Sequence, residues 1–180
     1  MSYKNENMKM IELHENGLDI QFRIRENGVV ELADFSSQEV KKAVMEPKDD
    51  ICYPAVEIHR SGTGSLNMHA YKNNINQSSV DFVYENHELK AQAGGKELEI
   101  VMISPEKLKA VYHMRLFDGV PAVQTWTEII NEGSEDQGLT YVSSFMYQGI
   151  SRGGEKPYYK KTDIYVPFNS WCCEAQWQKY

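Results

Sequence analysis

The sequence predicts an all-β protein built as an antiparallel β-sandwich. Apolar and polar residues alternate with a period of two through most of the chain, which is typical of strands with one buried face. Turn dipeptides such as Asn27-Gly28 and Asp118-Gly119 separate the alternating runs. No sustained helical period lies between these runs. Strands joined by short turns favour packed antiparallel sheets over any fold with helices between the strands.

The first element is a hairpin. Leu18, Ile20, Phe22 and Ile24 alternate with polar residues and predict a strand. Asn27-Gly28 follows, a dipeptide that readily takes the positive φ angles of a type I′ turn. Val30 and Leu32 then continue as the returning strand.

Further strands follow along the chain. The alternation is clearest from Leu108 to Leu116, where every second residue is apolar and His113 and Arg115 belong to the opposite face. We also expect strands at Val56 and Ile58, at Leu98, Ile100 and Met102, from Val120 to Ile130, and from Leu139 to Tyr147. A loop is expected from Asn131 to Gly138. Trp126, inside a strand, is expected in the core.

Some segments show no clear pattern. Ser36 to Val44 begins like a capping box and is either a short helix or a strand. The tail from Ser170 to Tyr180 is either a helix start or an ordered loop. The polar runs 72–79 and 151–156 predict loops.

The composition restricts the class of protein. A chain of 180 residues with 41% hydrophobic and 25% charged residues suits one soluble globular domain, residues 1–180. The net charge of −7 argues against a nucleic-acid partner. No apolar run approaches the ~18 residues of a membrane helix, and the first residues show no signal peptide. Three cysteines form neither a disulfide framework nor a zinc spacing, which favours a reduced, cytoplasmic protein with free thiols.

Several phrases, read in order, resemble those of α-galactosidases of glycoside hydrolase family 36. The most specific is Phe168-Asn169-Ser170-Trp171-Cys172-Cys173-Glu174-Ala175-Gln176-Trp177, which resembles an Asn-Ser-Trp-x-x-Glu-x-Gln-Trp phrase of one bacterial branch. Others are 54–58, the Tyr-x-x-His element at 84–89, 95–100, the turn at 116–121, 126–133 and 142–144. Together these phrases cover roughly residues 18 to 180.

The resemblance implies a fold and a role. The fold is a galactose-mutarotase-like supersandwich that packs beside a catalytic (β/α)8 barrel, and both catalytic aspartates of the family are on that barrel. The sandwich of the family is longer than this chain, so we expect a truncated sandwich without the barrel. The chain alone is then inactive, and the full-length enzyme removes terminal α-galactosyl residues. The sandwich supports the barrel and the assembly of a homo-oligomer, and no cofactor or metal is implied.

The resemblance also marks two candidate substrate-binding residues. Asp50 lies four residues before Pro54, where the family has an Asp on a loop that reaches the sugar site; the Arg that accompanies it is replaced here by Cys52 or Tyr53. The alternative is an ordinary solvated turn residue. Trp171 stands on a segment that borders the pocket in the family, where an indole can stack on a galactose ring. Trp177 is a weaker candidate of the same kind, and a core position is the alternative for both tryptophans.

Two other functions stay open. An aldose-1-epimerase-like enzyme would need a histidine and a carboxylate converging on the sugar ring. Glu57 with His69 or His87 is a conceivable pair, but their spacing does not support it. His87 itself is expected to serve a buried hydrogen bond. A free-standing carbohydrate-binding or assembly module is the third reading. For nearly all the acidic residues, which alternate with apolar ones along strands, we expect a solvated sheet face.

Overall fold

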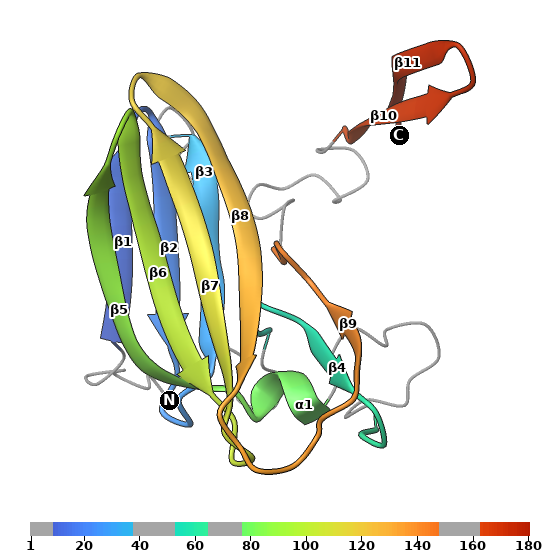
Figure 1. The fold of residues 1–180 in the computed structure, drawn as a ribbon. Helices are drawn as coiled ribbons and strands as arrows, with labels where there is room; N and C mark the ends of the chain where they lie inside the picture. Colours follow the sequence, from blue (N-terminus) through green and yellow to red (C-terminus); the bar gives the residue numbers. More distant parts are fainter. Residues whose placement is uncertain (1–8, 38–52, 65–76, 148–162) are drawn as a thin grey trace, which may run out of the picture.

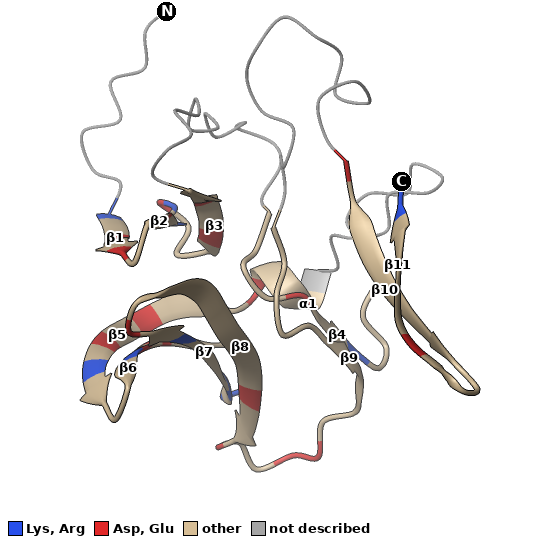
Figure 2. Ribbon diagram, turned by 90° about the horizontal axis from the view of Figure 1, so that it is seen from above, with Lys and Arg blue, Asp and Glu red and all other residues tan. Residues whose placement is uncertain are grey.

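Two antiparallel sheets that face each other form the main body of the protein (Figure 1). The computed structural model describes residues 9–37, 53–64, 77–147 and 163–180. One sheet has the order β1 (Lys9–Glu15), β2 (Leu18–Ile24), β3 (Val30–Ser37). The other has the order β5 (Val83–Gln92), β6 (Gly95–Ile103), β7 (Leu108–Phe117), β8 (Val120–Asn131). Viewed from above in Figure 2, the two sheets form two layers, which confirms the predicted all-β sandwich.

The core lies between these two layers. The residues predicted to share one face of β7 are all buried, with exposures of 2% or less for Leu108, Ala110, Tyr112, Met114 and Leu116. Leu98, Ile100 and Met102 on β6 are also buried, as predicted. Phe22 on β2 meets Tyr112 on β7 edge to face, with ring centroids 5.7 Å apart, so aromatic packing joins the two sheets.

The turns of the first sheet differ in part from the prediction. The hairpin of β2 and β3 is present, but at its turn only Gly28 has a positive φ, so the predicted type I′ turn is wrong. Instead, the Gly28 N–H donates to the Arg25 carbonyl and closes a four-residue turn. Gly28 is the last residue of this turn and has a left-handed φ of 84°. The positive-φ pair lies one hairpin earlier, at Asn16-Gly17 (φ 52° and 83°), where it joins β2 to a strand, β1, that we did not predict.

A third, smaller sheet lies beside the sandwich and pairs β4 (Ile58–Arg60) with β9 (Leu139–Val142). The predicted strands were longer, since Val56 lies outside β4 and 143–147 lie outside β9. The short helix α1 (Gln77–Val80) replaces the end of the predicted loop 72–79, whose residues 72–76 lie outside the described part. The buried hydroxyls of Ser78 and Ser79 donate to the Ile58 carbonyl, so side chains satisfy the free edge of β4.

The tail forms a β-hairpin, so both predictions for residues 170–180 are wrong. Strands β10 (Tyr165–Ser170) and β11 (Cys173–Lys179) pair with each other and stand apart from the sandwich (Figure 1). Of the ambiguous segment 36–44, Ser36 and Ser37 belong to β3, and the rest lies outside the described residues, as does the predicted loop 151–156. In the described part of the chain, no helix is both long and apolar enough to cross a membrane.

Candidate functional site

The candidate site lies on the face of the four-stranded sheet that points away from the core. Glu97 and Glu99 on β6 alternate with the core residue Leu98, so both carboxylates are on this outer face. The strand register places Glu99 directly opposite His113 on β7. Trp126 on β8 is opposite His113 on its other side. Three strands therefore bring these side chains together.

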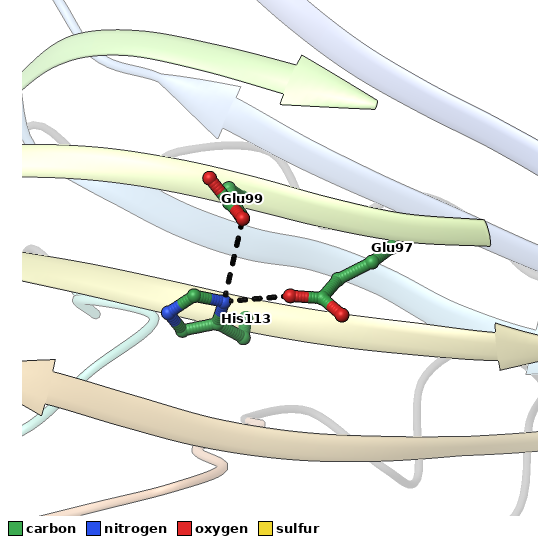
Figure 3. Close-up of side chains that lie close together, drawn as sticks. All are labelled: Glu97, Glu99 and His113. Atoms are coloured by element: carbon green, nitrogen blue, oxygen red, sulfur yellow. Dashed lines mark hydrogen bonds and ion pairs between the residues drawn. The ribbon is translucent and has the colours of Figure 1, made fainter. Parts of the chain in front are cut away.

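The imidazole of His113 faces both carboxylates through one nitrogen (Figure 3). Its Nδ1 lies 2.9 Å from Glu97 Oε1, a hydrogen bond, and 3.9 Å from Glu99 Oε1. One donor atom from each of the three residues lies within 4.8 Å of the others. One nitrogen and two oxygen donors thus converge on one small volume.

Neighbouring side chains hold the far oxygens of the two carboxylates. Gln92 Nε2 donates to Glu97 Oε2 at 2.7 Å. Lys90 Nζ donates to Glu99 Oε2 at 2.5 Å, and this hydrogen bond raises the pKa of the Lys90 ammonium. Each carboxylate is therefore fixed through one oxygen, while its other oxygen faces His113.

The cluster is more buried than an outer sheet face would suggest. Glu97 is 6% and His113 8% exposed, so the solvated position that we predicted for the acidic residues is wrong for Glu97. Trp126 stacks on the His113 ring, with centroids 4.6 Å apart and planes 6° from parallel. Trp126 is half-buried on this face, so its predicted core position is also wrong.

The second nitrogen of His113 has no hydrogen-bond partner among the described residues. Nε2 is buried and lies 3.8 Å from Glu128 Oε2, which is beyond hydrogen-bond distance. The ring is therefore held by stacking and by its Nδ1 contact, with one polar atom left over. Chemically, the arrangement can act as a buried ion-pair network or bind a cation through nitrogen and oxygen.

Of the predicted substrate-binding residues, Trp171 and Trp177 lie elsewhere. Asp50 is outside the described residues. Trp171 is at the turn of the β10–β11 hairpin and is 93% exposed, and Trp177 on β11 is 65% exposed. Both tryptophans are thus on the surface of the described protein, and the core alternative is wrong for each. Neither belongs to the Glu97–Glu99–His113 cluster.

The β10–β11 hairpin exposes other apolar side chains as well. These are Ile164, Tyr165, Phe168 and Tyr180. An ion pair also lies here, with Lys179 Nζ 2.9 Å from Asp163 Oδ2. Cys172 and Cys173 at the turn are free thiols, as predicted, and Cys52 lies outside the described residues. The surface of the hairpin is consequently rich in exposed aromatic side chains and carries few charges.

Of the histidine–carboxylate pairs that we considered, Glu57 with His87 is not formed. Glu57 contacts His59 at 2.7 Å, and His69 lies outside the described residues. His87 Nδ1 is instead 2.8 Å from the Tyr84 hydroxyl, which makes the expected hydrogen bond in a half-buried position. Burial, and then the charge of Lys9, lower the pKa of His87.

Sequence reasoning missed the His113 cluster. The alternation already placed Glu97 and Glu99 on one face of a strand, and His113 on the outer face of another. The signal that was lacking is the register between β6 and β7, which sets Glu99 opposite His113. A shift of one residue would have turned one set of side chains to the opposite face.

The chain matches no protein-family model, and no curated protein matches it. Among solved structures, the chain is similar to an α-galactosidase of glycoside hydrolase family 36 from Geobacillus stearothermophilus. The TM-score is 0.44 and the sequence identity 12%, and the match covers 71% of this chain and 23% of that protein. The structural similarity is weak, and the chain matches less than a quarter of the α-galactosidase.

Proposed function

We propose that this chain is the non-catalytic N-terminal β-sandwich domain of a cytoplasmic α-galactosidase, where it supports the catalytic barrel and the assembly of subunits. The observation that carries the proposal is the β10–β11 hairpin. The phrase at 168–177, the most specific part of the resemblance, forms this hairpin and presents Trp171 at 93% exposure. The hairpin is thus both the segment that most resembles the family and a surface that no described part of the chain covers.

The physical chemistry of the hairpin supports a role in docking. A two-stranded hairpin is at best marginally stable by itself in water, and needs a further surface to pack against. Clustered exposed aromatic side chains are typical of contacts with another protein surface or a sugar. We place the barrel, or the barrel of a neighbouring subunit, against this hairpin, with Trp171 and Asp50 at the mouth of the galactose pocket.

The outer-face carboxylates give no support to a glycosidase active site in the sandwich. A retaining glycosidase needs two carboxyl groups about 5 Å apart on either side of the bond that breaks. Glu97 and Glu99 are close together, but both point at His113, and Lys90 and Gln92 hold their other oxygens. Carboxylates held in this way do not support a glycosidase mechanism within the sandwich.

If the proposal holds, the complete reading frame encodes a longer protein that includes the barrel, and the test compares the 180-residue chain with that longer protein. We expect the longer protein to hydrolyse 4-nitrophenyl α-galactoside and the chain alone to give only the buffer rate. Turnover by the chain alone, from a host without galactosidase, would refute a non-catalytic role. A longer protein that lacks a barrel and leaves α-galactosides intact would refute the assignment to an α-galactosidase.

The same preparation tests the epimerase alternative. His113 and Glu97 are a histidine–carboxylate pair, but both side chains are buried, and Trp126 stacks on the His113 ring. We therefore expect no acceleration of the mutarotation of α-galactose, followed by polarimetry. Acceleration that His113→Gln removes would favour the epimerase.

A further inference from the structure

We infer that Glu97, Glu99 and His113 form a binding site for a divalent transition-metal ion, with Zn²⁺ as the best fit. The inference does not depend on the proposed α-galactosidase role. Imidazole nitrogen and carboxylate oxygen are the donors that zinc uses in sites with three protein ligands, where water takes the fourth position. The metal would be held by His113 Nδ1 and one oxygen of each glutamate.

The spacing of the donor atoms suits zinc. Bonds of about 2.0–2.2 Å in a tetrahedron put neighbouring ligand atoms roughly 3.4 Å apart. His113 Nδ1 is 2.9 Å from the Glu97 oxygen and 3.9 Å from the Glu99 oxygen, one value below this spacing and one above it. Small side-chain rotations would therefore bring both oxygens to the required distance. The backbone need not move, because adjacent strands already carry the donors.

The surrounding hydrogen bonds are those that metal ligands usually have. Ligating carboxylates are commonly held by a hydrogen bond to the oxygen that does not face the metal. Gln92 does this for Glu97, and Lys90 does it for Glu99. A ligating histidine commonly donates its other ring N–H to a carboxylate. His113 Nε2 is buried without a partner, and Glu128 stands 3.8 Å from it, so a small movement of Glu128 would complete this contact.

The charges on this face also favour a cation. The strand register puts the carboxylates Glu88, Glu97, Glu99 and Glu128 and the cations Lys90 and Arg115 on this part of the outer face. With a neutral imidazole, these side chains leave an excess of two negative charges, which one divalent ion neutralises. The Trp126 ring fixes the imidazole plane and shields that side of the site from water.

The experiment is a titration of the chelator-treated chain with ZnCl2, followed by isothermal calorimetry and by ¹H–¹⁵N spectra of the histidine rings. We expect one zinc per chain at this site, a shift of the His113 ring nitrogens, and a higher melting temperature because the ion binds the folded state. His113→Gln and Glu99→Gln should weaken binding by more than about 100-fold. Gln92→Ala should weaken it by roughly 10–100-fold, as is usual for residues that hold a ligand in place.

His59→Gln is the matched control. His59 also contacts a glutamate, Glu57, at 2.7 Å, but no third donor joins that pair within the described residues. This variant and Cys172→Ser/Cys173→Ser should bind zinc as the unchanged chain does. If His113→Gln does not fold, Glu99→Gln decides, because the Glu99 side chain is 22% exposed and the substitution keeps its shape. Absence of zinc binding, equal binding by Glu99→Gln, or zinc shifts that leave the His113 ring unchanged would each overturn the inference.

Discussion

Replacing Trp171 with alanine separates the functional interpretation of the β10–β11 hairpin from a structural one. The side chain is 93% exposed, so folding within the described chain removes little of it from water. A tryptophan presents on the order of 200 Å², so the buried remainder is roughly 15 Å². At about 25 cal/mol per Å², this area contributes about 0.4 kcal/mol. We expect Trp171→Ala to change the free energy of unfolding by no more than about 0.5 kcal/mol.

Phe22→Ala is the contrasting variant. Phe22 is fully buried and packs edge to face on Tyr112 between the two sheets. Truncation of a buried phenylalanine typically costs about 3–5 kcal/mol, because it loses burial and leaves a cavity. Urea denaturation of both variants, followed by circular dichroism, should therefore show a difference of close to tenfold between the two effects.

Trp171→Ala should have little effect on stability but a large effect on activity. In the proposed full-length α-galactosidase, loss of a contact that orients the sugar would cost about 1–3 kcal/mol, which is roughly one to two decades in kcat/KM. We expect Trp171→Ala and Asp50→Ala to reduce kcat/KM on an α-galactoside by this amount and to leave the melting temperature nearly unchanged. Wild-type kinetics in both variants would refute the assignment of these residues to the pocket. A loss of more than about 1 kcal/mol of stability in the isolated chain for Trp171→Ala would show that its indole is buried.

Three further predictions concern other parts of the molecule. Gly28→Ala should lower the free energy of unfolding, measured in urea, more than Gly62→Ala does. Both glycines have a positive φ. A Cβ at position 28 would lie 2.8 Å from the Cβ of Val83, whereas a Cβ at position 62 would have nothing within 4 Å. We expect a cost of about 1–2 kcal/mol at Gly62 from the backbone alone and about 1–3 kcal/mol more at Gly28 from the clash; equal costs would contradict this. Lys9→Met should raise the pKa of His87 toward 6.5 in an NMR titration, since burial and then the Lys9 charge lower it. A lowered histidine pKa means that the folded state loses stability as the pH falls through 6.5, so the variant should lose less there; an unchanged His87 pKa would be evidence against the Lys9 effect. The exposed sheet edges and the aromatic hairpin should recruit a second chain, so light scattering at high micromolar concentration should give a dimer or larger, and a clean monomer would count against this.

Much of the sandwich could be predicted from the sequence because a strand's side-chain period is a local property. The alternation from Leu108 to Leu116 identified each buried residue on that face of β7, and the run from Leu98 to Met102 did the same on β6. The turn chemistry was less decisive. Asn-Gly occurs twice in the chain, and only the backbone shows that the pair at Asn16-Gly17 takes two positive φ angles while Asn27-Gly28 takes one.

Only the tertiary structure decided the short helix and the polar cluster, because both depend on which strands become neighbours. Ser78 and Ser79 lie in a helix where the polar run predicted a loop, and their hydroxyls satisfy the edge of β4, a strand about twenty residues away in the sequence. The alternation put His113 and Glu97 on the outer face of their strands, yet both are buried; the register brings the two strands together, and Trp126 stacks on His113. The sequence by itself thus determined the period of the predicted strands and the core residues on β6 and β7. The pairing of the strands determined where the polar side chains meet, because contacts between distant residues leave no local pattern in either segment.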